Sequence, residues 1–234
     1  MAGKLYLIPC TLGEYEPSLV LPSPVFTLLR KLRVFVVEDI RSARRFLSAA
    51  GLRGHIGELE FHELNEHTRP EEVPGLAELF KKEDVGLISE AGLPAVADPG
   101  AALVALCHEH GIQVVPLVGP SSLMLALMAS GLNGQSFAFC GYLPAKSEER
   151  RSALRAVEKR SALENQTQII IETPYRNDSM LADMLAVLRP GTRLCIAADI
   201  TLPTEFIRTR SIASWKRNPP TIGKRPCVFL ILSQ

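Results

Sequence analysis

The chain has 234 residues, of which 47% are hydrophobic and 22% charged, and its formal net charge is +1. This composition is typical of a globular protein with one large or two modest domains. No apolar run reaches the ~18 residues that a membrane span needs, and the N-terminal residues lack the layout of a signal peptide. We therefore expect a cytoplasmic protein that has no membrane partner.

Five cysteines are scattered singly in apolar surroundings, at positions 10, 107, 140, 195 and 227. We expect reduced, buried thiols and not disulfides. The five histidines lack a frame of cysteines or paired carboxylates around them. The sequence therefore predicts no metal site.

Charge is unevenly distributed along the chain. Residues 206–234 contain no Asp or Glu, but they contain six cations: Arg208, Arg210, Lys216, Arg217, Lys224 and Arg225. Such a basic segment favours a polyanionic partner, although a solvated face is the more common explanation.

Strand and helix patterns alternate in the first half. Apolar runs predict strands at residues 5–9, 33–38, 59–64, 85–89 and 112–116. Helices are expected at residues 43–50, 71–82 and 100–110, and the last of these has Asp98 as its expected N-cap and Pro99 in its first turn. Regular alternation of this kind indicates a mainly parallel sheet covered by helices.

The second half follows a different pattern. It has predicted helices at residues 121–130, 148–160 and 178–188, and strands at residues 137–141, 167–173, 193–199, 205–209 and 226–232. Successive strands without a helix between them indicate antiparallel pairing. We expect an α/β chain with an N-terminal α/β domain at residues 1–117 and a mixed α+β domain at residues 118–234.

The segment from Val85 to Gly100, VGLISEAGLPAVADPG, joins a buried strand to a loop of small residues. Gly92 and Pro94 turn the chain where the peptide groups have little side-chain cover. Loops at the carboxyl ends of strands in open α/β sheets commonly bind ligands. The segment is thus either a ligand-binding backbone or an ordinary connection from strand to helix.

Three common catalytic motifs are absent from the sequence. No Gly-x-Gly-x-x-Gly follows a strand, no Walker-type Gly-Lys-Ser/Thr opens a helix, and no Gly-x-Ser-x-Gly occurs. A standard dinucleotide fingerprint, phosphoryl transfer and serine hydrolysis are therefore disfavoured.

Four segments, in order, resemble the tetrapyrrole methylase superfamily, the class III S-adenosylmethionine (SAM) methyltransferases. They are LYLIPCTLG at residues 5–13, VEDIR at 37–41, SEAGLPAVADPG at 89–100 and VPLVGPSS at 115–122. Three further segments resemble the bacterial branch that methylates a cytidine ribose 2′-hydroxyl in small-subunit ribosomal RNA. These are GYLPAK at 141–146 with Arg150 and Arg151, ETPYRN at 172–177, and residues 201–205.

The resemblance implies a two-domain tetrapyrrole-methylase-like fold, a SAM cleft between the domains and a homodimer. Carried over by position, it assigns ten residues to SAM: Ile8, Pro9, Gly92, Leu93, Val96, Ser121, Ser122, Glu172, Ala198 and Cys227. Helix capping is an alternative for the two serines, and core packing is an alternative for Ala198 and Cys227.

Methyl transfer from SAM needs an aligned nucleophile and a dry site, and it needs neither a metal nor a covalent residue. A sugar hydroxyl is a weak nucleophile, so a carboxylate base can assist it. Glu38 and Asp39 follow the second strand and are the candidate catalytic residues. Helix capping by Asp39 and an ion pair with Arg41 are the alternative.

Candidate substrate-binding residues lie in both halves. Arg41, Arg44 and Arg45 share a helix face that can hold phosphates or be simply solvated. Tyr175 and Arg176 follow a strand and can contact a base or pack in a turn, and Asn65 follows the third strand.

The chain departs from the ribosomal branch at several polar positions: Glu90, Leu93, Ala198, Leu202 and Arg225. We expect a SAM-dependent methyltransferase that acts on a ribose 2′-hydroxyl of ribosomal RNA, with the small ribosomal subunit as its partner. A paralogue with a small-molecule acceptor, tetrapyrrole-like or other, and a noncatalytic RNA-binding or ribosome-binding protein are the alternatives.

Overall fold

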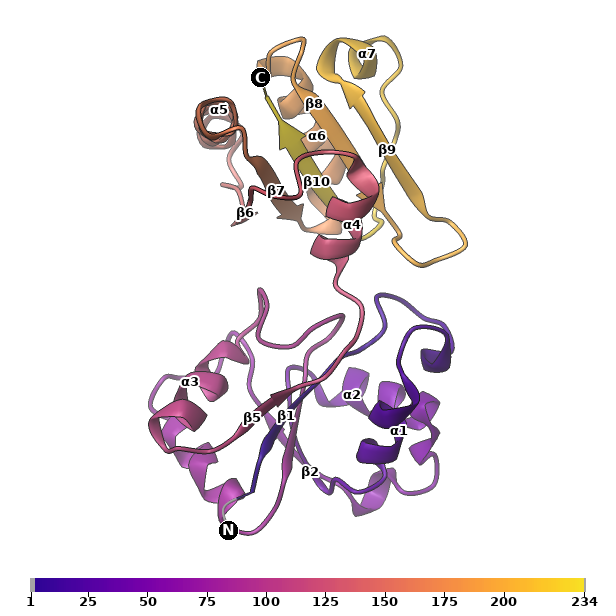
Figure 1. Cartoon of the computed structure of the whole chain (residues 1–234), viewed down its shortest axis with the longest axis vertical. Coiled ribbons are helices and arrows are strands. Elements are labelled where there is room, and N and C mark those ends of the chain that lie inside the picture. Colours follow the sequence, from indigo (N-terminus) through magenta and orange to yellow (C-terminus); the bar gives the residue numbers. More distant parts are fainter. Residues whose placement is uncertain (1–2, 234) are drawn as a thin grey trace. The chain divides into compact units, whose positions relative to one another are not determined.

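The computed structural model describes residues 3–233 (Figure 1). Packing divides the chain into two compact units, one within Met1–Ser121 and the other within Ser122–Gln234. Each unit contains one five-stranded sheet. The sequence predicts the domain boundary at residues 117 and 118, in the connection that follows the last strand of the first unit. The cleft expected between the domains stays a prediction.

The first unit alternates strands and helices along the chain. Its strands are β1 (Leu5–Ile8), β2 (Val34–Val37), β3 (Glu60–Glu63), β4 (Val85–Ile88) and β5 (Val114–Pro116). Its α-helices are α1 (Ser23–Leu29), α2 (Ile40–Leu47) and α3 (Ala101–Glu109). Shorter or irregular helical segments are η1 (Pro17–Leu19), η2 (Ser48–Leu52), η3 (Ile56–Glu58) and η4 (Val73–Lys81).

The five strands of the first unit are all parallel, in the order β3-β2-β4-β1-β5. Strands β2 and β4 are buried along their whole length, as expected for a sheet that is covered on both faces. Helices α1 and α2 pack against one face, and η4 and α3 pack against the other. The predicted parallel α/β architecture is confirmed.

Two local predictions in the first unit are wrong. Residues 71–82 do not form an α-helix, because Pro74 and Gly75 lie in its first turns and the segment adopts the 3₁₀ helix η4. Asp98 is not the N-cap of α3, since Gly100 occupies that position. The Asp98 carboxylate instead accepts the N–H of Gly100, the residue directly before the helix, at 2.6 Å.

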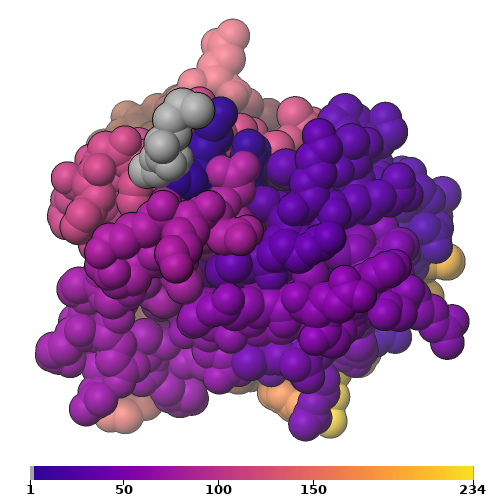
Figure 2. Space-filling model, turned by 90° about the horizontal axis from the view of Figure 1, so that it is seen from below, coloured from indigo at the N-terminus to yellow at the C-terminus, as the bar shows by residue number. Residues whose placement is uncertain are grey.

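The strands of the first unit all begin at one end and finish at the other. Figure 2 views the molecule from below, the end at which β1 begins in Figure 1, and shows atoms packed into a continuous surface there. Polar residues predicted for the site follow the opposite, carboxyl ends of the strands.

The second unit has a mixed sheet. Its strands are β6 (Phe137–Tyr142), β7 (Thr167–Glu172), β8 (Arg193–Ala198), β9 (Phe206–Ser211) and β10 (Cys227–Leu232). Its helices are α4 (Ser122–Ser130), α5 (Ser147–Glu164), η5 (Pro174–Arg176), α6 (Asn177–Val187) and α7 (Ile212–Arg217).

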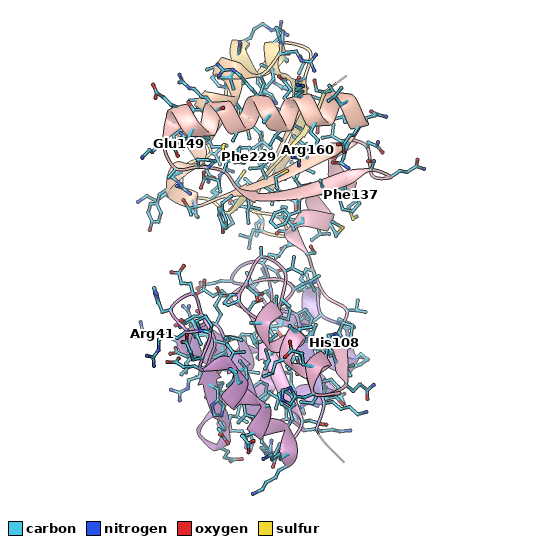
Figure 3. All side chains as sticks on the ribbon, turned by 90° about the vertical axis from the view of Figure 1, so that its left-hand side faces the viewer. Arg41, His108, Phe137, Glu149, Arg160 and Phe229 are labelled. Carbon is cyan, nitrogen blue, oxygen red and sulfur yellow. The ribbon has the colours of Figure 1, made fainter. Side chains whose placement is uncertain are left out.

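The strand order in this sheet is β6-β7-β10-β8-β9. Strands β6 and β7 are parallel, and the other neighbours are antiparallel, so the predicted mixed α+β character is confirmed. Helices α5, α6 and α7 share one core with the sheet, and α4 crosses its other face (Figure 1). Phe229 lies inside this core (Figure 3).

All five cysteines are free thiols. No helix within residues 3–233 is both long and apolar enough to span a membrane.

Candidate functional site

The carboxyl edge of the parallel sheet gathers predicted residues from four strands. Ile8 and Val37 both pair with Ile88, and Val37 also pairs with Glu63, so these strand ends form one row. Pro9, Glu38 and Ser89 directly follow this row, and Asn65 comes two residues after β3. The structure therefore brings together residues that are up to 80 positions apart in the sequence.

The loop after β4 has an unusual backbone. Gly92, Ala95 and Ala97 have φ angles of 72°, 64° and 61°, in the left-handed region. A Cβ atom on Gly92 would lie 3.1 Å from Leu12 Cδ2, so glycine suits both the backbone angle and the available space. The Gly92 carbonyl also accepts the Cys10 N–H at 2.8 Å, which holds this loop to the loop after β1.

Within this loop, the side chains predicted to contact a ligand differ in exposure. Val96 is 45% exposed, Leu93 is partly buried and Gly92 is buried. An apolar side chain that remains exposed on a fixed loop is available for contact with a ligand. The left-handed residues at positions 95 and 97 agree with a ligand-binding loop, because strained backbone is concentrated at functional sites.

Asp98 belongs to this loop, and the sequence assigned it only a capping role. Its Oδ2 atom is buried and has no hydrogen-bond partner among the described residues. Burial raises the pKa of Asp98, although the backbone N–H groups of Gly100, Ala95 and Val96 oppose the change. A buried carboxylate oxygen without a donor is a feature that only the folded loop reveals.

The two candidate catalytic carboxylates have different environments. Glu38 Oε2 accepts the Glu90 N–H at 3.1 Å, and burial, followed by smaller repulsive effects from neighbouring carboxylates, raises the pKa of Glu38. Asp39 is the N-cap of α2 and accepts the Ser42 N–H at 2.7 Å, which lowers its pKa. The alternative capping role of Asp39 is therefore present.

The Arg41 charge also attracts the Asp39 carboxylate and contributes to its lowered pKa, but the two side chains do not form an ion pair. Arg41 points outward from the first unit (Figure 3).

Three arginines of α2 lie on one exposed face, as predicted. Arg44 stacks over the Phe61 ring at 5.2 Å, and Arg45 forms an exposed ion pair with Glu14 at 3.7 Å. Together with Arg41 they line a pocket of about 550 Å³, and its remaining lining residues are Asp39, Ile40 and Glu63. This pocket places cations beside Asp39, whereas Glu38 is not among its lining residues.

A second pocket, of about 450 Å³, lies within the first unit and includes residues to which the sequence assigned no individual role. The loop after β1 forms most of its wall, from Cys10 to Tyr15, and Glu90 and Ala91 form another part. Helix α2 contributes Ser42, Arg45 and Phe46. Residues 10–13 of this loop belong to the segment LYLIPCTLG named above, and the position of the loop at the carboxyl end of β1 is typical of a ligand site.

In the second unit, three of the predicted SAM residues form one row. Cys227 on β10 pairs with Glu172 on β7 and with Ala198 on β8. Ala198 and Cys227 pack in the core, and burial raises the pKa of the Cys227 thiol to about 12. Core packing, the alternative role, is therefore present for both residues.

Glu172 differs from its two neighbours because it carries a charge. Its Oε1 atom accepts the Thr173 N–H at 2.7 Å and an Arg176 N–H at 2.8 Å. Its Oε2 atom is buried and has no partner among the described residues. The carboxylate thus retains one acceptor for a donor that these residues do not supply.

Two predicted substrate residues next to Glu172 have different surroundings. The Arg176 guanidinium is held by Glu172 at 2.6 Å, whereas Tyr175 is 80% exposed. The Lys224 ammonium lies 4.9 Å from the centre of the Tyr175 ring. Tyr175 is therefore the more accessible of the pair.

Ser121 and Ser122 lie where the first unit gives way to the second. Ser122 is the first residue of α4, and Ser121 directly precedes it. Both are partly buried. Their position is compatible with the alternative role in capping the helix.

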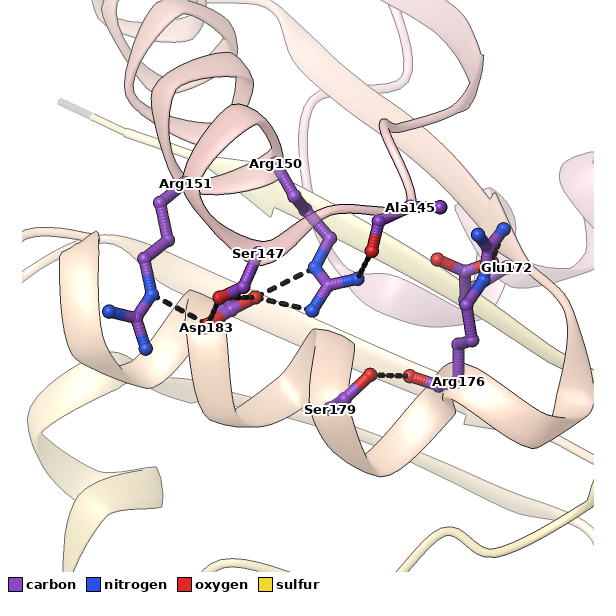
Figure 4. Close-up of polar contacts among 8 residues, drawn as sticks. All are labelled: Ala145, Ser147, Arg150, Arg151, Glu172, Arg176, Ser179 and Asp183. Carbon is purple, nitrogen blue, oxygen red and sulfur yellow. Dashed lines mark hydrogen bonds and ion pairs between the residues drawn. The ribbon is translucent and has the colours of Figure 1, made fainter.

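Arg150 and Arg151, which accompany the GYLPAK segment, have a clear structural role (Figure 4). Both donate to Asp183 on α6, at 2.7 Å and 2.6 Å, and Ser147 donates to the same carboxylate at 2.9 Å. These contacts fasten α5 to α6. Within residues 3–233, no group of three or more His, Cys, Asp or Glu side chains is arranged to hold a metal ion.

Comparison with known proteins places this geometry in a family. The sequence pattern of the family described as Tetrapyrrole (Corrin/Porphyrin) Methylases matches residues 25–214. Ribosomal RNA small subunit methyltransferase I of Escherichia coli O157:H7 is 35% identical over 232 residues, which cover 98% of this chain and 77% of that protein. The protein of the same name from Pseudomonas aeruginosa is 34% identical over 234 residues, with coverages of 98% and 79%.

Among solved structures, the methyltransferase CobJ matches with a TM-score of 0.65 and covers 99% of this chain and 95% of its own. Because the two sequences are only 16% identical, this similarity shows the fold alone. The family match and the two curated relatives agree with the segments that first indicated the family. This chain belongs to the tetrapyrrole methylase family and is a SAM-dependent methyltransferase.

Proposed function

We propose that this protein methylates ribosomal RNA of the small ribosomal subunit and that the acceptor is a ribose 2′-hydroxyl. The main support for the RNA substrate is that 98% of the chain is 35% identical to an enzyme named for that substrate. The arginine-lined pocket beside Asp39 supports it, because cations bind the phosphates of RNA.

Features of both units support a SAM site. The loop after β4 has left-handed residues at Gly92, Ala95 and Ala97 and an exposed apolar side chain at Val96. In the second unit, Glu172 Oε2 is a buried acceptor that lacks a donor, and an amino or hydroxyl group of the adenosine would supply one. When bound, SAM supplies a methyl group that its sulfonium sulfur activates.

Ten residues make up the proposed SAM contacts. The first unit contributes Ile8, Pro9, Gly92, Leu93, Val96 and Ser121. The second unit contributes Ser122, Glu172, Ala198 and Cys227. For Ala198 and Cys227 the proposed contribution is apolar surface and backbone, since both side chains also pack in the core.

Glu38 is the better candidate of the two carboxylates for the general base. A base works best when its pKa is near the working pH, and burial raises the pKa of Glu38. Asp39 has a lowered pKa and uses its carboxylate to cap α2. We assign proton acceptance to Glu38 and the positioning of α2 to Asp39.

Substrate contacts are proposed for residues on both units. Arg41, Arg44 and Arg45 would hold phosphates, and Asn65 lies at the same sheet edge. Tyr175 would stack on a base, because its ring is exposed. Arg176 would act mainly by holding Glu172, because its guanidinium is already paired.

A homodimer and a cytoplasmic location are part of the same proposal. Family resemblance supports the homodimer, and a ribosomal substrate supports the location. Sedimentation of the purified protein checks the oligomeric state, and fractionation of cells checks the location.

The decisive experiment transfers radiolabelled methyl groups from SAM to small ribosomal subunits. Subunits from cells that lack this modification are compared with fully modified subunits, and the RNA is then digested to nucleosides. We expect label in a 2′-O-methylnucleoside from the unmodified subunits only. Label on a base would refute the ribose acceptor while preserving the RNA substrate.

Two other outcomes separate the alternatives. Tight SAM binding without label in RNA, and without affinity for the subunits, would favour a small-molecule acceptor. Binding to the subunits without any transfer would favour a noncatalytic RNA-binding protein.

A further inference from the structure

Cations gather on one side of the second unit, around β9, α7 and the segment that leads into β10. Phe206, Arg208 and Arg210 alternate along β9 and therefore share a face. This is the face on which α7 packs, because Phe206 and Trp215 belong to the same core. The side chains of the edge strand β9 thus project beside α7.

These side chains form a connected set through aromatic rings. The guanidinium of Arg210 lies 5.0 Å from the centre of the Trp215 ring. Arg208 and Arg225 both lie over Phe206, at 5.5 Å and 5.9 Å. The Phe206 and Trp215 rings are themselves 6.5 Å apart, so the three guanidinium groups lie along one strip.

Lys224 extends this strip to an exposed aromatic ring. It neighbours Arg225 in the sequence and lies 4.9 Å from the centre of the Tyr175 ring. The basic strip, as we define it, therefore consists of four cations and one aromatic residue: Arg208, Arg210, Lys224, Arg225 and Tyr175.

The charges of the strip are largely unneutralised. Arg208, Arg210 and Lys224 form no ion pair with any of residues 3–233, and the Arg225 pair with Asp199 is long, at 3.9 Å. No Asp or Glu follows Glu205 in the sequence. The nearby Asp178 carboxylate accepts the N–H groups of Ile222 and Gly223, and so it is engaged with the backbone.

Contact with the rings restricts the cations of the strip. A guanidinium held over a ring keeps N–H donors available while its side chain loses freedom before any partner arrives. Ordering such a surface on binding therefore costs less entropy than ordering free lysines. A row of fixed cations that ends in an exposed aromatic ring fits a chain of phosphates with accessible bases.

We propose that the basic strip is a surface on which the RNA substrate docks, through phosphates along β9 and β10 and a base on Tyr175. This inference rests on the proposed RNA substrate, and it adds a binding surface on the second unit to the candidate site residues. The strip contributes affinity and orientation, whereas it has no part in the transfer of the methyl group.

The test compares two double variants of the full-length protein. Arg208→Gln with Lys224→Gln removes two exposed charges from the strip. Arg155→Gln with Lys159→Gln removes two exposed charges from α5, which covers β7 and β10 and not β9. Binding of a fluorescent single-stranded RNA and of small ribosomal subunits is measured over a series of KCl concentrations, and SAM affinity is measured by calorimetry.

We expect the strip variant to bind RNA at least about tenfold more weakly than the wild type at physiological salt. The slope of log K against log salt should fall by about 1.4, since each lost single-strand phosphate contact removes about 0.7. SAM affinity and the thermal midpoint should stay unchanged, and the α5 variant should bind RNA as the wild type does. KM for ribosomal subunits should rise in the strip variant, with kcat retained.

Two results would overturn the inference. If the wild type is active and the strip variant, the α5 variant and the wild type have equal RNA affinity and salt slope, then RNA docks elsewhere. The proposed function would stand in that case. A wild type that neither binds nor methylates RNA would remove the proposed function and this inference with it. Tyr175→Ala supplies a second measure, and it should weaken RNA binding without changing the salt slope.

Discussion

Replacing Asp183 by asparagine tests whether its ion pairs hold the second unit together. Asp183 and Arg150 are both 4% exposed at their side chains, whereas Arg151 is 46% exposed. Asp183→Asn removes the charge that compensates the buried Arg150 guanidinium. Loss of one partner from a buried ion pair costs about 3–5 kcal/mol, a large share of the ~5–15 kcal/mol that stabilises a typical domain.

The assay uses the single tryptophan of the chain. Trp215 is 2% exposed in the core of the second unit, so its fluorescence reports the unfolding of that unit. If the free energy of unfolding falls by about 2 kcal/mol for each molar of urea, the urea midpoint of unfolding should be about 2 M lower for Asp183→Asn than for the wild type. Arg151→Gln is the matched control, and it should cost at most about 1 kcal/mol because that side chain is half exposed.

The difference between Asp183→Asn and the wild type should also depend on pH. Burial acts to raise the pKa of Asp183, but the hydrogen bonds from Arg151, Arg150 and Ser147 outweigh it and hold the pKa below its ordinary value. The stabilisation is therefore present above the ordinary pKa of an unfolded aspartate and is lost as the pH falls through the lower pKa of the folded protein.

Two results would refute the reasoning. One is an Asp183→Asn variant within about 1 kcal/mol of the wild type at neutral pH. The other is a difference that grows as the solution is acidified.

Three further predictions concern the first unit. Val96→Arg should weaken SAM binding by about tenfold or more, which corresponds to about 1.4 kcal/mol, because it places a cation beside a cationic cofactor. Unchanged SAM affinity in calorimetry would remove Val96 from the proposed site. Glu38→Gln should slow methyl transfer about 100-fold at unchanged SAM affinity. The wild-type rate should fall as the pH drops through the raised pKa of Glu38. A Glu38→Gln variant with the wild-type pH profile would exclude Glu38 as the base. Asp39→Ala should lower the free energy of unfolding by about 1 kcal/mol, since it removes the acceptor for the Ser42 N–H. Asp39→Asn keeps an acceptor, so its free energy of unfolding in the same urea titration should change little. Equal losses in the two variants would contradict the capping role.

Local sequence patterns were enough to predict most of the architecture. The four apolar residues of β2, VFVV, are buried on both sides, and runs of this kind alternate with helical patterns through the first unit. Such runs need cover on both faces, which is why they indicate a parallel sheet. The resemblance likewise led to the family, because several motifs occur in the same order.

Local conformation was harder to predict where it depended on distant contacts. The helix α1, which carries Pro24 near its start, is absent from the elements that the sequence predicts. Pro24 lies in the first turn, where the missing N–H costs nothing, and Val25 and Leu29 bury one face of the helix in the core. Tertiary packing of its apolar face therefore stabilises this short helix.

The sequence by itself determined most of the strands and helices, the loop after β4 and the family, because each of these depends on residues that are near neighbours in the chain. Only the tertiary structure decided which charges pair. It engaged Arg150 and Arg151 with Asp183, left an oxygen of Glu172 without a donor and aligned the cations of the basic strip on aromatic rings. The physical reason is that the energy of a charge depends on its burial and on partners up to dozens of residues away, and the fold alone brings these together.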